Sequence, residues 1–209
     1  MKRSIYILVP MLLYTSILLA QSPGFRAGYS LSNIYARSYH LQSGDAGHGF
    51  TVGVFYDIPL DQTFSLRPEL NYSQKGGEYY SNFLSVEMDL SYIDLPVGLH
   101  ISNFKPFCFS FGTQLSILVD IETRYYSFYN YQHKRNFQFE KDNDPADYHR
   151  INVGGFTAIG FQLDKVIIEI RVAFDWLPID RSRILDGLEI EEHGLKTFSL
   201  QATAGYMFD

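Results

Sequence analysis

The chain lacks the features that mark a disulfide-rich, metal-binding or nucleic-acid-binding protein. Its 209 residues contain one cysteine, Cys108, which excludes an internal disulfide framework and a CxxC metal site. Charged residues make up 19% of the chain, there is no basic patch and the formal net charge is −6, so no nucleic-acid partner is expected. The histidines have no HExxH spacing, and no metal site is expected either.

Long hydrophobic runs are absent after residue 20. Residues 1–20 have the pattern of a secretory signal, with Lys2 and Arg3 ahead of the apolar run Ile5–Leu19 and an expected cleavage after Ala20. That run is short for a membrane-spanning helix, which needs about 20 apolar residues. We therefore expect a signal peptide over residues 1–20 and a mature domain over residues 21–209.

What the chain does contain is regular alternation of apolar and polar residues. In residues 64–73, FSLRPELNYS, every second residue from Phe64 to Tyr72 is apolar and those between are polar or charged. Successive side chains of a strand point to opposite faces, so this segment has one apolar and one polar face. Its length matches the roughly 9–11 residues that a tilted strand needs to cross a bilayer. Aromatic residues, at 16% of the chain, are typical of membrane–water interfaces.

The same alternation recurs in eight segments, joined by connections that are alternately short and long. The longest connection is 121–149. This pattern predicts an all-β fold, an eight-stranded antiparallel up-and-down transmembrane β-barrel with an apolar outside and a polar inside. Pairing of the first strand with the last would leave no open edge in the membrane. The expected strands are 24–32, 48–57, 64–73, 84–102, 106–120, 150–163, 166–176 and 196–208.

Two of these strands carry irregularities. Pro68 lacks a ladder donor, and we expect a bulge or the local loss of one ladder bond there. In 84–102 the apolar phase changes at Tyr92–Ile93, which predicts a β-bulge at that point because a slip of one residue turns every later side chain to the other face. With that bulge, Val86, Met88, Leu90 and Tyr92 would face lipid, and Glu87, Asp89, Ser91 and Asp94 would face inward.

Several segments in fixed order resemble a known family. These are FRAGYSLSN, LRPELNYSQKGG, YIDLPVGL, FSFGTQLSILVD, VGGFTAIGF, IIEIRVAFDWLPI and LQATAGYMFD. Together they resemble the outer-membrane β-barrel proteins of the Bacteroidota called PorT-like or "porin family", small barrels of the OmpA/OmpX kind. The resemblance implies a location in the Gram-negative outer membrane after export. It also implies a possible place in a secretion assembly, since PorT belongs to the type IX secretion system.

The inward positions are expected to form a structural polar network that plugs the barrel. Eight strands enclose a space that side chains just fill, and charges in that space must pair. We expect Arg67 to pair with an acid such as Glu69, and the arginines to face more acids than they can neutralise. The network is predicted to comprise Arg26, Arg67, Glu69, Glu87, Asp89, Asp94, His100, Glu169 and Arg171.

The sequence favours a non-enzymatic outer-membrane protein with a structural or surface-interaction role. The expected partners are outer-membrane lipid and, through residues 121–149, secretion or surface proteins; the barrel is expected to be a monomer without a cofactor. One alternative is a component of a secretion or transport assembly. Another is a lipid-modifying or proteolytic enzyme, because a loop histidine beside an acid or a serine could act as a base. No spacing singles out such a set among His40, His48, His133, His149 and His193.

Overall fold

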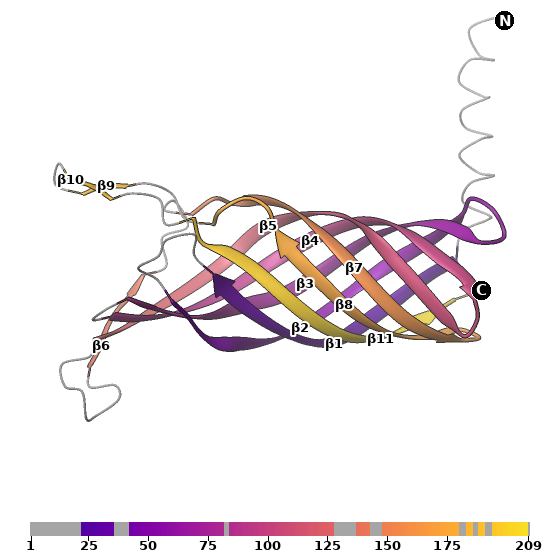
Figure 1. Ribbon diagram of the computed structural model, residues 1–209, viewed down its shortest axis with the longest axis horizontal. Coiled ribbons are helices and arrows are strands. Elements are labelled where there is room, and N and C mark those ends of the chain that lie inside the picture. Colours follow the sequence, from indigo (N-terminus) through magenta and orange to yellow (C-terminus); the bar gives the residue numbers. More distant parts are fainter. Residues whose placement is uncertain are drawn as a thin grey trace, which may run out of the picture.

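The computed structural model describes residues 22–35, 42–81, 84–127, 137–142, 148–179, 183–185, 188–190 and 194–208. The expected signal peptide, residues 1–20, lies outside these ranges. Eleven strands occur in the described residues (Figure 1). They are β1 (Ser22–Tyr35), β2 (Gln42–Pro59), β3 (Phe64–Ser81), β4 (Leu84–Phe104), β5 (Phe107–Ser127), β6 (Phe137–Asp142), β7 (Ile151–Leu163), β8 (Val166–Asp175), β9 (Arg183–Leu185), β10 (Leu188–Ile190) and β11 (Lys196–Met207).

Eight of the strands form a closed barrel. Their order is β4-β3-β2-β1-β11-β8-β7-β5, and a further pairing between β4 and β5 closes the ring. Every pairing is antiparallel, and β1 pairs with β11 from Gly24↔Met207 to Tyr35↔Lys196. The prediction of an all-β, eight-stranded antiparallel barrel closed by its first and last strands is therefore confirmed. Within the described residues, no helix has both the length and the apolar character to cross a membrane.

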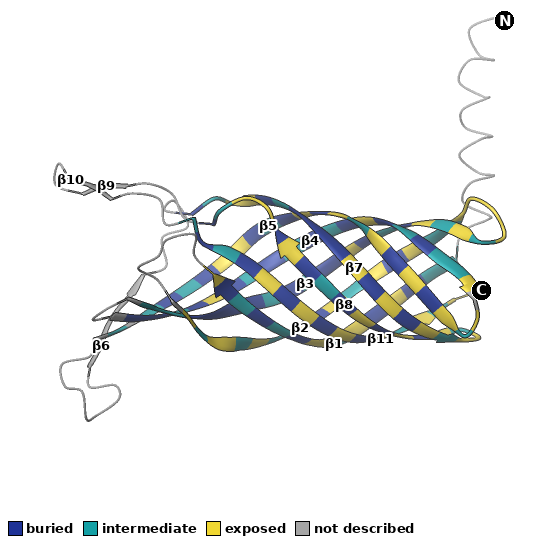
Figure 2. Cartoon of the chain, in the orientation of Figure 1, coloured by how far each residue is buried: buried dark blue, intermediate teal, exposed yellow. Residues whose placement is uncertain are grey.

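Burial alternates along much of the barrel wall, as Figure 2 shows. On β8, Ile168 and Ile170 are 58% and 53% exposed on the outside, whereas Glu169 and Arg171 are 2% and 1% exposed inside. The apolar set of β3 also faces outward, with Leu70 49% exposed and its neighbour Asn71 buried. The wall is thus apolar on the outside and polar within, the reverse of a water-soluble barrel.

The two ends of the barrel differ. The tight turns at residues 60–63, 105–106 and 164–165 lie at one end of the barrel, which we call the turn end (Figure 1). Ser22 and Phe208 lie there too, since Ser22 pairs with Asp57 and the Phe208 N–H donates to Pro23 O. The other end, the loop end, carries β6, which pairs with β5, and the separate β9–β10 hairpin (Figure 1). In bacterial barrels short turns face the periplasm and long loops face outward.

Pro68 is accommodated by a local loss of ladder pairing, the second of the two expected alternatives. The β3–β4 register runs from Phe64↔Ile101 to Ser81↔Leu84 with no shift. Between β3 and β2, pairing breaks after Phe55↔Glu69 and resumes at Ile58↔Leu66 in the same register. The missing proline donor therefore interrupts the ladder without moving any side chain to the other face.

The bulge expected in β4 lies instead on β5, at the same level of the barrel. Ser91 pairs with Asp120 and Tyr92 with Leu118, so Val119 is the extra residue. A bulge flips the side chains of the bulged strand alone, and β4 keeps a single phase. The prediction that Val86, Met88, Leu90 and Tyr92 face lipid was therefore wrong: all four are at most 2% exposed. Asp120, which follows the extra residue on β5, is exposed.

Candidate functional site

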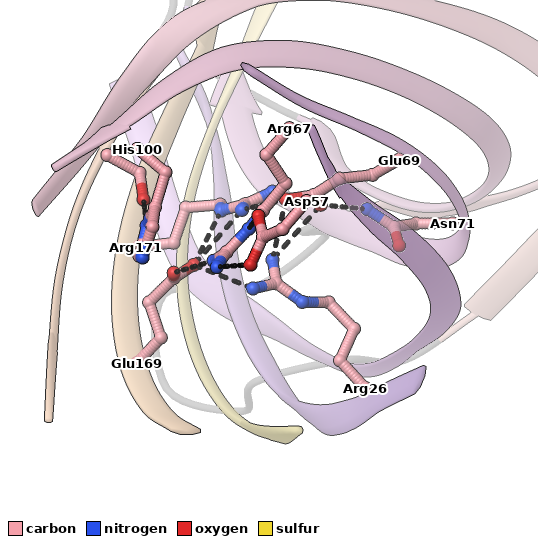
Figure 3. Close-up of polar contacts among 9 residues, drawn as sticks. Arg26, Asp57, Arg67, Glu69, Asn71, His100, Glu169 and Arg171 are labelled. Carbon is pink, nitrogen blue, oxygen red and sulfur yellow. Dashed lines mark hydrogen bonds and ion pairs between the residues drawn. The ribbon is translucent and has the colours of Figure 1, made fainter. Parts of the chain in front are cut away.

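The centre of the barrel holds six charged side chains from four strands (Figure 3). Each occupies an inward position of an alternating strand, which is why their ionic ends meet in the lumen. Arginine and glutamate side chains of the set are at most 3% exposed, and Asp57 is 15% exposed. We call this set the central network; it comprises Arg26 (β1), Asp57 (β2), Arg67 and Glu69 (β3), and Glu169 and Arg171 (β8).

Glu69 is the acceptor at the middle of the central network. Arg171 donates to both of its carboxylate oxygens, from Nη1 at 2.8 Å and from Nη2 at 2.7 Å. Arg26 donates from Nη1 at 3.0 Å and 3.2 Å, and Asn71 donates from Nδ2 at 2.9 Å. Two guanidinium groups from strands far apart in the sequence, β1 and β8, therefore converge on one buried carboxylate. Their hydrogen bonds are charge-assisted, and the pair from Arg171 is bidentate.

The remaining charges complete a balanced set. Arg67 donates to both oxygens of Asp57, at 2.6 Å and 2.7 Å, and its Nη1 lies 3.8 Å from Glu169. Glu169 also lies 3.2 Å from Arg26 and 3.0 Å from Arg171. Arg67 therefore pairs with Asp57 and not, as expected, with Glu69. With three arginines and three acids in contact, the central network carries no excess of acid. Asp94 and Asp175 are buried as well, so the interior acids outnumber the three arginines, as expected.

A second polar group lies inside the barrel nearer the loop end. Lys75 Nζ is 3.2 Å from Asp94 Oδ1 and 4.7 Å from the centre of the Tyr92 ring. Ser73 donates to the other oxygen of Asp94, and Thr197 donates to Asp175. Sequence reasoning missed Lys75 as an interior cation, although its place in the β3 alternation after Arg67 and Ser73 could have identified it.

Two aromatic rings sit among the interior charges. Phe55 lies under Arg67 and Arg26, whose guanidinium carbons are 4.8 Å and 5.5 Å from the ring centre. Phe156 lies 4.4 Å from Arg171 in the same way. These contacts are attractive because the ring face is electron-rich. Gly98 makes room for the second ring, since a Cβ there would lie 2.6 Å from the Phe156 Cζ.

The structure brings together most of the predicted site residues. Seven lie inside: Arg26, Arg67, Glu69, Asp94, His100, Glu169 and Arg171. His100 lies toward the turn end, with its Nδ1 2.9 Å from Ser110 Oγ. Glu87 and Asp89 were placed inside incorrectly. Their side chains are 36% and 52% exposed on the outer face of β4, where they pair with Arg124 at 3.5 Å and 3.1 Å.

An apolar cluster fills the loop end of the barrel above the charged groups. It includes chain segments that fold back over the mouth: the His149 N–H donates to Ile179 O and the Ile179 N–H to Leu195 O, both at 2.7 Å. Every member is at most 7% exposed. We call this the loop-end cluster; it comprises Ile34, Val86, Met88, Leu90, Tyr92, Leu118, Ile121, Tyr148, Ile179 and Leu195.

The loop histidines do not assemble into a site within the described part of the chain. His40, His133 and His193 fall outside the described residues. His48 Nδ1 contacts the Tyr29 hydroxyl on the outer wall. In the ranges that the structure describes, no group of three or more histidine, cysteine, aspartate and glutamate side chains is arranged to hold a metal.

The sequence matches the model of a known protein family. The sequence model of the outer membrane protein beta-barrel domain matches residues 20–176. A comparison with curated protein sequences finds no significant match.

Two solved barrels resemble the fold. Neisserial surface protein A has a TM-score of 0.52 and 11% identity, covering 89% of this chain and 97% of that protein. Ail of Yersinia pestis, in complex with the heparin analogue sucrose octasulfate, has a TM-score of 0.51 and 12% identity, covering 90% and 99%. At these identities the likeness concerns the fold alone.

Proposed function

Because the chain belongs to the outer membrane protein beta-barrel domain family, we propose that it is a non-enzymatic integral protein of the Gram-negative outer membrane with a filled interior. Its role is structural or one of surface interaction. The outward-facing apolar side chains fit a lipid environment, and the closed ring leaves no strand edge that requires a second copy. We therefore propose that the barrel acts as a monomer.

The observation that carries the proposal is the filling of the lumen by two stacked layers. The central network spans the lumen through contacts between β1, β2, β3 and β8, and separating its ions would expose charges of opposite sign in a low-dielectric space. Above it, the loop-end cluster is apolar and excludes ions. A hydrated ion would have to displace both layers to cross.

Planar-bilayer recording tests this proposal. The purified barrel, with its folded state checked by gel mobility before and after boiling, should give no stable large conductance. As a positive control, the double variant Met88→Gly, Arg171→Ala removes volume from both layers and should conduct more often than the wild type. Steady open-channel currents from the wild-type protein would refute the filled interior and indicate a pore.

A role in a secretion or transport assembly is the second candidate. The PorT-like segments LRPELNYSQKGG and YIDLPVGL favour it, and the 121–149 connection is long enough to reach a partner protein. Residues 128–136 and 143–147 of that connection lie outside the described residues. Affinity purification from detergent-solubilised membranes tests the idea, with a variant in which residues 128–147 are replaced by a glycine–serine linker as control. A stoichiometric partner that depends on the loop would support it, whereas recovery of the barrel alone would not.

We do not propose that this chain binds the sulfated ligand of the Ail structure. Sucrose octasulfate is a polyanion, whereas the outer face of β4 and β5 near the loop end presents Glu87, Asp89, Asp120 and Glu122 around Arg124. Like charges across an interface oppose association. We infer that a surface partner of this face would carry positive charge.

Alanine substitution of His48 and His149 tests the remaining enzymatic alternative, which predicts a hydrolytic activity that these changes abolish.

A further inference from the structure

A hollow of about 240 Å³ opens at the turn end of the barrel. Its volume is below the roughly 300–1,000 Å³ of sites for drug-sized ligands, so it suits a group of a few atoms. The central network and the loop-end cluster lie beyond it, which makes it a blind pocket that opens only toward the turns. Its lining comes from six strands and a turn: Ser22, Asp57, Pro59, Asp61, Phe64, Ser65, His100, Ser102, Gln162 and Met207.

The pocket contains an unused polar atom at its floor. His100 is 2% exposed, its Nδ1 is engaged by Ser110 and the Gln162 side chain stands close to its ring, but its Nε2 forms no well-aligned hydrogen bond in the described residues. Asp57 stands beside it with both oxygens bound by Arg67 on the inner side. The Asp57 side chain is 15% exposed and lines the pocket, whereas Arg67 is 1% exposed and does not, so the carboxylate is the charged group of this pair that a ligand would meet.

The charge of the lining indicates the kind of group that fits. The ionised side chains that line it are Asp57 and Asp61, and neither lysine nor arginine is among the lining residues. Asp61 Oδ1 accepts the N–H groups of Thr63 and Phe64 at 2.7 Å, which holds the turn and leaves Oδ2 available. Hydroxyls add further acceptors, and Phe64 and Met207 give an apolar side.

We propose that this pocket binds a primary ammonium group carried on a short alkyl stem, as in a lysine side chain or a free amine. The carboxylates and the hydroxyls accept the three ammonium protons, and the stem contacts Phe64 and Met207. The inference rests on the proposed function, because the pocket is blind only while the interior is filled. In the outer membrane its mouth faces the periplasm, so the amine belongs to a periplasmic molecule.

Titration of the barrel in lipid nanodiscs with n-butylammonium chloride tests the proposal. The readout is the ring carbon–proton NMR signal of His100, one of six histidines, assigned by its loss in His100→Asn. We expect a saturable shift with butylammonium, and none with n-butanol, sodium butyrate or sodium chloride at equal ionic strength. An equal shift with n-butanol would overturn the role of charge, and no shift with butylammonium would overturn the site.

The sharpest variant is Asp61→Asn, which keeps an oxygen to accept the Thr63 and Phe64 amides while removing the charge. It should weaken butylammonium binding by about two- to five-fold, as expected for one exposed charge pair. The control Glu122→Gln, at the loop end, should leave binding unchanged. Equal affinity of Asp61→Asn and wild type would contradict the proposal.

Two further probes identify the source of the amine. Tighter binding of N-acetyl-lysine-N-methylamide than of putrescine would indicate a lysine of a periplasmic protein, and the reverse would indicate a free polyamine. Conductance recordings on the same preparation separate the two hypotheses. A silent bilayer without butylammonium binding overturns the pocket alone, whereas open-channel currents overturn the filled interior.

Discussion

Replacement of Glu69 by glutamine should strongly destabilise the barrel. The carboxylate receives bonds from Arg26, Asn71 and Arg171 at 2.7–3.2 Å, and its side chain is 1% exposed. Glu69→Gln keeps the volume but leaves three arginines facing two acids. Removing one partner of a buried ion pair costs about 3–5 kcal/mol because the other charge stays buried without compensation.

Urea unfolding in lipid vesicles measures this loss. Trp176 is the only tryptophan and is 47% exposed on the outer wall, so its fluorescence reports on the wall leaving the lipid. The matched control is Glu122→Gln, whose side chain is 33% exposed and pairs with Arg124 at 3.0 Å on the outer face. An exposed pair of this kind contributes about 0–1 kcal/mol, so the control should unfold close to the wild type.

A double variant tests whether charge balance is the cause. Glu69→Met combined with Arg171→Met leaves two arginines and two acids, and buried pairs replaced by apolar groups are often neutral. The double variant should therefore be more stable than the sum of its single variants, by about 0.5–3 kcal/mol for residues in direct contact. If Glu69→Gln unfolds like Glu122→Gln, the lumen is hydrated and the reasoning fails.

Three other experiments give separate predictions. Leu70→Arg on the outer wall should lower the yield of folded barrel in vesicles, because an arginine facing lipid destabilises the folded barrel by about 2–4 kcal/mol. Leu60→Arg at a turn tip should fold normally, and equal yields of the two variants would place Leu70 outside the lipid. Met88→Ala in the loop-end cluster should lower the free energy of unfolding in urea by about 2–5 kcal/mol, whereas Asp89→Ala should leave it almost unchanged. If Met88 faced lipid and Asp89 the interior, Asp89→Ala would be the more damaging change. Cys108, 1% exposed, should resist maleimide labelling in the folded barrel and react after unfolding, and rapid labelling of the folded form would contradict its inward position.

The sequence by itself determined the barrel and most of its faces. Leu70 and Asn71, or Ile170 and Arg171, differ sharply in polarity, and a strand must place such neighbours on opposite sides. Strand count, antiparallel closure and the inward position of most charged residues follow from that alternation and from the lengths of the connections. Cys108 also follows the rule, since it alternates with Phe107 and Phe109.

Alternation does not reveal the surroundings of an apolar side chain. Phe55 keeps the alternation of β2 between the outward Val54 and Tyr56, but its place beneath two arginines became clear only from the structure. The phase of Val86–Tyr92 was misjudged for a related reason: an apolar side chain suits either lipid or a dry interior cluster. Polarity alone cannot distinguish the two surroundings.

The pairing of interior charges depended on tertiary structure as well. Whether Arg67 meets Glu69 or Asp57 depends on how β2 and β3 are registered, and whether Glu69 meets Arg171 depends on closure across the lumen. The strand that takes the extra residue at the bulge, Val119 on β5, is likewise a property of two paired strands together. A period of two specifies the face of each side chain, whereas its partner is decided by long-range register, which local sequence does not encode.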